Sequence, residues 1–248
     1  MQLQQFFQKN PKIAVAFSGG VDSSYLLYAA DAAGCDVHAY FIKSEFQPQF
    51  ELDEVIYFTK NLDVPLTVEN YSVLHDPFIT ENTPDRCYKC KTKILNKLWM
   101  LARENGYKVL CDGTNADDVE SDRPGMKALR EQGVLSPLRD CGLGKQEIRF
   151  LSKQAGLPTH DKPAYACLAT RVPVGTQITI EILNKIERSE DALFKMGFSD
   201  FRVRLLPPDI ARLQIPNSQW NEASAQRKEI LEILRPYFCN VVLDMESR

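Results

Sequence analysis

Short runs of β-branched and other apolar residues alternate with helical patterns from residue 12 to about residue 156. This alternation predicts βαβ units, in which each strand is followed by a helix that crosses back over the sheet. The expected strands are residues 12–17, 37–42, 65–70 and 108–113, and the expected helices are 23–33, 50–61, 86–105, 124–132 and 145–155. We therefore expect an α/β, Rossmann-like fold with a mostly parallel sheet covered by helices.

The pattern changes in the last third of the chain. Residues 157–177 contain three prolines and no sustained periodicity, which predicts an ordered loop, and loops of this length are usually functional. Beyond it we expect a helix at 178–196, strands at 201–206 and 210–215, a helix at 221–234 and a strand at 240–245. The predicted domains are a main domain at 1–160, an interdomain loop at 161–177, and a small α+β domain at 178–248 with an antiparallel strand pair.

The composition argues against several classes of function. The chain has 30 Lys and Arg against 33 Asp and Glu, so its net charge of −3 gives no overall field that attracts nucleic acid or an anionic membrane. The N-terminal sequence lacks the apolar core of a signal peptide, and no apolar run approaches the roughly 20 residues that span a bilayer. Seven cysteines are a sparse and odd set, which favours chemical or packing roles over a secreted disulfide framework. We expect a cytoplasmic protein with no nucleic-acid or membrane partner.

The string Ser-Gly-Gly-Val-Asp-Ser, residues 18–23, lies between the first expected strand and the first expected helix. The pair Gly19 and Gly20 lets the backbone bring its amide groups close to a ligand, and amides at a helix N-terminus favour a phosphate. Ser18 and Ser23 add hydroxyl donors, and the Asp22 carboxylate suits Mg²⁺ among phosphates. The motif is neither the Walker type nor the dinucleotide type. The alternative is a plain strand-to-helix turn with polar caps, but the combination of residues favours a phosphate cradle.

This string resembles the PP-loop of the ATP pyrophosphatases, which adenylylate a substrate and release pyrophosphate. The resemblance implies ATP and Mg²⁺ as cofactors. A second string, Gly-Thr-Asn-Ala-Asp-Asp at 113–118, follows the fourth expected strand, at the sheet edge where α/β folds bind ligands, so Gly113 and Asp118 are further candidates for the ATP site.

Together with "KPAYACLATRVPVGTQIT" at 162–179, these strings closely resemble the LarE family over nearly the whole chain. That family contains ATP-dependent sulfur transferases that make the nickel-pincer nucleotide cofactor. The resemblance implies a small nucleotide substrate, pyridinium-3,5-biscarboxylic acid mononucleotide. Its carboxylate is activated as an acyl adenylate, and a sulfur atom then replaces AMP to give a thiocarboxylate. The resemblance also implies a homo-oligomer.

Cys167 is the candidate for sulfur delivery. It lies in the expected interdomain loop with Lys162 and Arg171 close in sequence, and nearby cations lower the pKa of a thiol. It also aligns with the family's sulfur-donor cysteine. The alternative is a packed core residue, because a cysteine between Ala and Leu is often buried.

Cys87 and Cys90 form a Cys-x-x-Cys pair on one face of an expected helix, where they can share a metal or a cluster. The pair alone leaves open half a zinc site, a redox pair or two incidental thiols. His38, His75 and His160 are scattered and complete no zinc site.

Family members with a similar extra pair hold a [4Fe-4S] cluster on three cysteines, which implies a cluster on Cys87, Cys90 and Cys167. Sulfide or a cysteine desulfurase would then be the sulfur source. Other members sacrifice the sulfur of the donor cysteine, which becomes dehydroalanine. Cys111 and Cys239 lie in or beside apolar strands, and we expect both to pack in the core.

The strand expected at 201–206 places Arg202 and Arg204 on one face, and two adjacent guanidiniums suit a phosphate or carboxylate. Spacing alone favours a solvated strand face. The resemblance implies that this pair, with Arg171 and Glu190, contributes to an anionic substrate site. The chain departs from the family pattern after Arg204, where Gln214 stands in place of an expected Glu.

Three other functions remain as alternatives. A tRNA thiolation enzyme also joins adenylylation to cysteine sulfur, but it needs an RNA-binding surface that the composition does not provide. Amide-forming relatives use ammonia, and their chemistry leaves Cys167 unexplained. A regulatory protein that only holds ATP would release no pyrophosphate.

Overall fold

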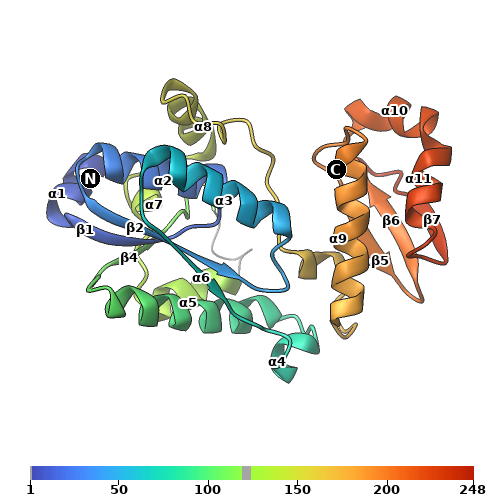
Figure 1. The fold of residues 1–248 in the computed structure, drawn as a ribbon, viewed down its shortest axis with the longest axis horizontal. Helices are drawn as coiled ribbons and strands as arrows, with labels where there is room; N and C mark the ends of the chain where they lie inside the picture. The colour runs from blue at the N-terminus through green and yellow to red at the C-terminus, as the bar shows by residue number, and fades with distance from the viewer. Residues whose placement is uncertain (1, 119–123) are drawn as a thin grey trace. The chain divides into compact units, whose positions relative to one another are not determined.

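The computed structural model describes residues 2–118 and 124–248, and the chain divides into two compact units. Unit 1 consists of Met1–Ser44, Gln49–Ser72 and Asp85–Lys162, and unit 2 of Glu45–Pro48, Val73–Pro84 and Pro163–Arg248. Figure 1 shows the elements of both units. Residues 119–123, within the segment that carries the family resemblance, lie outside the described residues.

Unit 1 is built on a four-stranded parallel sheet with the order β3-β2-β1-β4. The strands are β1 (Lys12–Ala16), β2 (Asp36–Lys43), β3 (Leu66–Asn70) and β4 (Leu110–Asp112). From β1 the chain builds outward to β2 and β3, and then returns to place β4 on the other side of β1. The strand order therefore switches at β1, and the carboxyl ends of β1 and β4 form the edge where such sheets bind ligands.

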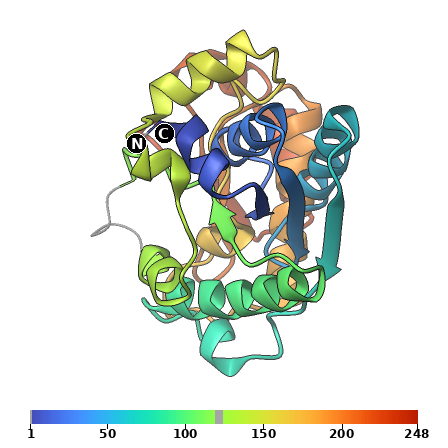
Figure 2. The same cartoon turned by 90° about the vertical axis from the view of Figure 1, so that its left-hand side faces the viewer.

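Helices cover both faces of this sheet. They are α1 (Leu3–Lys9), α2 (Val21–Ala32), α3 (Gln49–Leu62), α5 (Arg86–Glu104), α6 (Pro124–Glu131), α7 (Pro137–Asp140) and α8 (Lys145–Gln154). One core joins the sheet to α1, α2, α3, α7 and α8, and a second core joins the opposite face to α5 and α6. Figure 2 shows α5 along one face of the sheet and the blue helices along the other.

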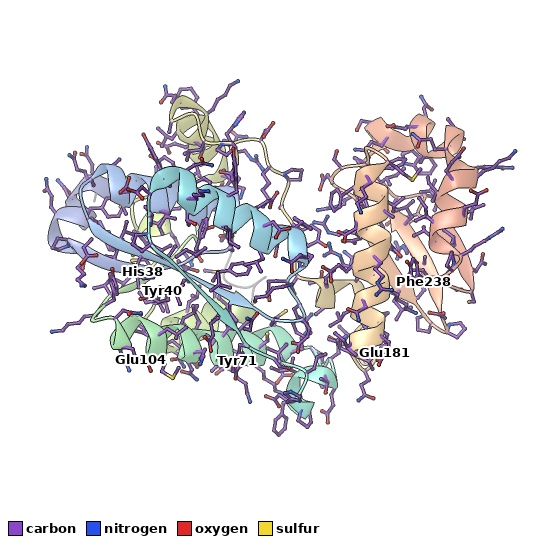
Figure 3. The ribbon with its side chains drawn as sticks, in the orientation of Figure 1. His38, Tyr40, Tyr71, Glu104, Glu181 and Phe238 are labelled. Atoms are coloured by element: carbon purple, nitrogen blue, oxygen red, sulfur yellow. The ribbon has the colours of Figure 1, made fainter. Side chains whose placement is uncertain are left out.

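The amphipathic pattern of α5 explains why this long helix lies on the sheet. Leu95, Leu98 and Ala102 recur at helical spacing and are buried. On the sheet face that they cover, the His38 ring stacks on the Tyr40 ring with centroids 4.5 Å apart (Figure 3). His38 Nε2 also lies 2.8 Å from Thr67 Oγ1, so this half-buried ring has a polar partner on the neighbouring strand β3.

Unit 2 contains a three-stranded sheet with the order β5-β6-β7. Its elements are α4 (Pro77–Thr80), η2 (Leu168–Arg171), α9 (Ile180–Lys195), β5 (Arg202–Leu206), β6 (Ile210–Gln214), η3 (Asn217–Gln219), α10 (Trp220–Ala225), α11 (Arg227–Leu234) and β7 (Asn240–Leu243). β5 and β6 are antiparallel, as predicted, and β7 runs parallel to β6. The parallel sheet of unit 1 and the small mixed sheet of unit 2 confirm the expected fold class.

One helix of unit 2 differs from the sequence prediction. The single helix expected at 221–234 is wrong, because the backbone leaves helical geometry at Gln226 and separates α10 from α11. The proline-rich segment is tied down by residues from the first half of the chain. Asn82 Nδ2 donates to Pro173 O at 2.8 Å, and Ile178 N donates to Thr80 O at 2.8 Å.

Across the described ranges 2–118 and 124–248, we find no helix with the length and apolar character needed to cross a membrane.

Candidate functional site

The turn after β1 has the geometry of an anion cradle. Gly19 has a φ of +70°, and Gly20 is the extended N-cap residue from which α2 begins. Ser23 Oγ lies 3.1 Å from Ser18 Oγ and donates to Gly20 O at 3.1 Å, so the two hydroxyls fold the turn onto the helix start. The first-turn amides of α2 therefore form the positive end of that helix's dipole. They lie at the edge of the sheet where the strand order switches.

Glycine is required at two positions of this site by close approach of neighbouring atoms. A Cβ at Gly19 would lie 2.7 Å from Val55 Cγ1. A Cβ at Gly113, just after β4, would lie 2.7 Å from Ser23 N and 2.9 Å from Ser23 Cα. The end of β4 therefore packs directly against the first turn of α2. The structure thus brings Gly113 to the turn at residues 18–23, which we call the phosphate turn.

Asp22 has the environment of a metal-binding carboxylate. Its Oδ2 pairs with Lys145 Nζ at 2.6 Å. Its Oδ1 is buried and has no hydrogen-bond partner within the described parts of the chain. A buried carboxylate oxygen without a partner is costly unless it binds a ligand, and carboxylate oxygens beside phosphates suit Mg²⁺. The residues present therefore fit Mg²⁺, which would be held by Asp22 and would neutralise phosphate charge.

The segment after β4 forms a tight polar turn at the same sheet edge. Asp112 accepts hydrogen bonds from Thr114 Oγ1 at 2.6 Å and Ser136 Oγ at 2.7 Å. Asp118 Oδ2 accepts from Asn115 N at 3.1 Å, so the predicted ATP-site residue Asp118 stabilises this turn. Asp117 Oδ2 accepts from Lys145 N at 2.6 Å and thereby fixes the start of α8.

Sequence reasoning missed two lysines that reach the phosphate turn. Lys145, at the start of α8, pairs with Asp22, and Lys162 Nζ donates to Gly19 O at 2.9 Å and to Glu54 Oε2 at 2.5 Å. From the sequence, Lys162 was predicted only to be a cation near Cys167. The available signal for Lys145 was its place at the start of an expected helix on the same sheet edge.

In unit 2, Arg171 and Glu190 form a fully buried ion pair, with side chains 0% and 1% exposed. Arg171 Nε donates to Glu190 Oε1 at 3.0 Å, and Arg171 Nη2 donates to Oε2 at 3.1 Å. Glu190 also accepts from Tyr165 OH at 2.5 Å and from Val203 N at 2.8 Å. With both carboxylate oxygens engaged, Glu190 is placed to orient Arg171 and Tyr165.

The structure brings Arg202 and Arg204 of β5 to the segment that carries Cys167. Arg202 lies over the Tyr165 ring at 4.9 Å and donates to Ala164 O at 2.5 Å, and Arg204 Nη1 donates to Thr170 O at 2.6 Å. Burial, with the positive charges of Arg171 and Arg248, lowers the pKa of Arg202 to about 10. Burial and neighbouring arginines likewise lower the pKa of Arg204. An excess of buried positive charge of this kind favours an anionic ligand.

Cys167 is half-buried and precedes η2 as its N-cap residue. Its carbonyl oxygen accepts from Thr170 N at 2.9 Å, from Thr170 Oγ1 at 2.8 Å and from Arg171 Nη1 at 3.4 Å. The backbone of this cysteine is therefore fixed by the same arginine that Glu190 orients.

Cys87 and Cys90 lie one turn apart near the start of α5 in unit 1, half-buried and buried respectively, whereas Cys167 belongs to unit 2. Among the residues described here, no group of three or more His, Cys, Asp or Glu side chains is arranged to hold a metal ion. The three-cysteine cluster therefore stays a prediction.

Two further cysteines test the packing predictions. Cys111 is buried in the core, as expected, and burial raises the pKa of its thiol. The prediction that Cys239 packs in the core is wrong. Cys239 is exposed and its Sγ donates to Asp209 O at 3.0 Å, because the strand that it precedes, β7, is largely exposed.

Comparison with known proteins agrees with this geometry. Residues 11–133, which include both polar turns, match the family described as the tRNA methyl transferase HUP domain. The sheet order, the turn at 18–23 and this match define a PP-loop ATP-dependent enzyme.

Three relatives are similar to this chain, and two of them match most of its length. An uncharacterized protein of Synechocystis sp. is 33% identical over 99% of this chain and 92% of its own length. The pyridinium-3,5-bisthiocarboxylic acid mononucleotide synthase of Lactiplantibacillus plantarum is 33% identical over 84% of this chain and 76% of its own length. A tRNA-specific 2-thiouridylase of Dichelobacter nodosus is 27% identical over 60% of this chain and 49% of its own length. The chain belongs to the PP-loop ATP pyrophosphatases, in the family of the first two relatives.

Proposed function

We propose that this protein is an ATP-dependent sulfur transferase that acts on pyridinium-3,5-biscarboxylic acid mononucleotide. The observation that carries the proposal is the phosphate turn, where one Asp22 oxygen has no partner among the residues that the structure describes. The chain is also 33% identical to a pyridinium-3,5-bisthiocarboxylic acid mononucleotide synthase over 84% of its length. The arginine-rich surroundings of Cys167 in unit 2 support the same proposal.

The first step is adenylylation of a substrate carboxylate. A carboxylate oxygen attacks the α-phosphorus of ATP, the bond to the β-phosphate oxygen breaks, and pyrophosphate leaves. The turn at Ser18, Gly19, Gly20 and Ser23 binds phosphate through amides and hydroxyls, with Gly113 and Asp118 shaping its other side. Asp22 would hold Mg²⁺, which would neutralise phosphate charge when bound.

The second step replaces AMP with sulfur. A sulfur nucleophile at Cys167 attacks the acyl carbon, and the acyl–oxygen bond to AMP breaks. Arg202 and Arg204 bind the anionic groups of the substrate, and Arg171, oriented by Glu190, fixes the Cys167 backbone.

Two sulfur sources are consistent with this step. In the first, Cys87, Cys90 and Cys167 would hold a [4Fe-4S] cluster, and the cluster would supply an extra sulfide. In the second, Cys167 forms a thioester with the substrate. Loss of its Cα proton and breakage of its Cβ–S bond then release the thiocarboxylate and leave dehydroalanine.

The test measures pyrophosphate release and the mass of the nucleotide product after anaerobic incubation with ATP, Mg²⁺ and the dicarboxylate nucleotide. We expect pyrophosphate release that depends on this nucleotide, and exchange of carboxylate oxygen for sulfur. Cys167→Ser should retain pyrophosphate release and lose sulfur transfer. Pyrophosphate release that depends on tRNA and not on the nucleotide would replace the proposal with tRNA thiolation.

The same sample distinguishes the sulfur sources. Iron assay and the intact protein mass after turnover are measured together. Bound iron that Cys87→Ala removes, with an unchanged protein mass, supports the cluster. Absence of iron, with loss of the mass of H₂S from Cys167, supports the sacrificial route.

A further inference from the structure

The side-chain ammonium groups of Lys145 and Lys162 both contact residues of the phosphate turn, although they are distant from it in the sequence. Lys145 and Asp22 are separated by 123 residues, and Lys162 and Gly19 by 143. We propose that Lys145 and Lys162 bind the β- and γ-phosphates of ATP and hold the pyrophosphate product. This inference rests on the ATP site of the proposed function and deepens it.

Lys145 is positioned by the turn that follows β4. Its backbone N donates to Asp117 Oδ2, and a Cβ on the preceding Gly144 would lie 3.0 Å from both carboxylate oxygens of Asp117. The backbone of Lys145 is therefore fixed against the carboxyl edge of the sheet. Its side chain is 33% exposed and reaches across to Asp22, so its ammonium can move to a phosphate oxygen nearby.

Lys162 is positioned by Arg149 of α8. The Arg149 guanidinium donates to His160 O and to Lys162 O, each at 2.7 Å, which anchors the backbone on both sides of Asp161. The Lys162 side chain is only 16% exposed and contacts the carbonyl of Gly19, inside the phosphate turn. This ammonium lies within reach of any phosphate that the turn binds.

The charges explain why these lysines would bind the leaving phosphates. Backbone amides and serine hydroxyls carry no net charge, and Mg²⁺ neutralises only part of the triphosphate. Each lysine is paired with a carboxylate, Lys145 with Asp22 and Lys162 with Glu54. Mg²⁺ bound at Asp22 Oδ1 would withdraw charge from the carboxylate and so weaken its attraction for Lys145 at Oδ2, which would leave Lys145 available to a phosphate. Lysine suits this exchange, since it is a flexible point charge that binds phosphate without a fixed fork geometry.

The test compares the binding of pyrophosphate, ATP and AMP in the presence of Mg²⁺ by isothermal titration calorimetry. We expect Lys145→Gln and Lys162→Gln each to weaken pyrophosphate and ATP binding about 10- to 100-fold, the range for a lost charge-assisted hydrogen bond. AMP binding should change less than about twofold, because AMP lacks the β- and γ-phosphates. Lys153→Gln, on the exposed face of the same helix α8, is the matched control and should bind all three ligands like the wild type.

Equal weakening of AMP and pyrophosphate binding would overturn the inference, since it would mean that the lysines only support the fold of the turn. A wild-type protein that binds neither ATP nor pyrophosphate would overturn it as well. The assay contains no pyridinium nucleotide and no sulfur step. Failure of sulfur transfer with intact pyrophosphate binding would therefore overturn the proposed substrate and leave this inference standing.

A second measurement guards against a variant that is merely unstable. Binding of Mn²⁺ in the absence of nucleotide is followed by electron paramagnetic resonance. Lys145→Gln frees Asp22 from its partner, so Mn²⁺ binding should tighten, whereas Lys162→Gln should leave it unchanged. Weaker Mn²⁺ binding in a folded Lys145→Gln protein would count against the exchange.

Discussion

Only glycine fits at position 113, because the backbone there lies directly against the backbone of Ser23 in the phosphate turn. Gly113→Ala must shift the first turn of α2, since backbone atoms cannot move aside as a flexible side chain can. We expect a loss of about 1–3 kcal/mol in the free energy of unfolding, together with weaker ATP binding. Urea denaturation and calorimetry measure both. Gly20→Ala is the stability control, since its Cβ would find its nearest neighbour at 3.6 Å. Equal destabilisation by both variants would contradict this argument.

Because Arg171 and Glu190 form a buried ion pair, we expect a single substitution to lower the free energy of unfolding more than the double substitution does. Glu190→Leu leaves a buried guanidinium without its carboxylate and should cost about 3–5 kcal/mol in the free energy of unfolding. Adding Arg171→Met removes the unpaired charge and should restore part of that loss. Urea denaturation of the two single variants and the double variant completes the cycle. A double variant less stable than Glu190→Leu alone would contradict this expectation and would show that the hydrogen bonds from Arg171 to Ala166 O and Thr170 Oγ1 outweigh the cost of its unpaired charge.

His38 gives the protein a pH-dependent stability. Burial lowers the pKa of His38 from its usual value, and the nearby Asp36 opposes this only in part. The unfolded chain therefore binds more protons than the folded chain at pH values just below about 6.5, so stability falls as the pH drops through that range. His38→Asn should flatten the pH dependence of the urea midpoint between pH 5 and pH 7. The exposed His75→Asn is the control, and an unchanged slope in His38→Asn would assign the dependence to other groups.

At the scale of elements, helix starts depend on individual side chains. Thr179 Oγ1 accepts from Ile182 N at 3.3 Å and caps α9, the helix that carries Glu190. Thr179→Ala should lower the free energy of unfolding by about 1 kcal/mol, whereas Thr179→Ser keeps the hydroxyl and should cost less. Thermal unfolding of the two variants checks the order. If both lose equally, the Thr179 methyl group matters more than the cap.

Regular elements were the part of the fold that sequence predicted best. The parallel strands and α5 follow from strong apolar periodicity, and the phosphate turn follows from residues adjacent in sequence. Three features were out of reach. The seven-residue α1 is too short to show a period, although Phe6 and Phe7 are buried in the core. The break at Gln226 has no proline or glycine to mark it. The contact between Lys145 and Asp22 joins residues 123 positions apart, which only the folded sheet brings together.

At the scale of the whole molecule, the two units should respond differently to nucleotide. A ligand at 100 times its Kd stabilises the part that binds it by about 2.7 kcal/mol. We expect Mg²⁺ and ATP to slow hydrogen exchange at the first turn of α2 and at β4, both in unit 1. Exchange in β5–β7 should change far less. Mass spectrometry of peptic fragments resolves these elements, and uniform protection of both units would contradict separate responses. The expected homo-oligomer stays a prediction.

The segment Val73–Pro84 also has a consequence for synthesis on the ribosome. It belongs to unit 2, yet Asn82 precedes its partner Pro173 by 91 residues. At about 5–20 residues per second, those residues take several seconds to translate. During that interval Ile79, fully buried in the finished protein, has no core to enter and is a natural target for a chaperone that protects nascent chains. Slowing or speeding translation of the stretch between Asn82 and Pro173 should therefore change the yield of folded protein more than the same change made after residue 178.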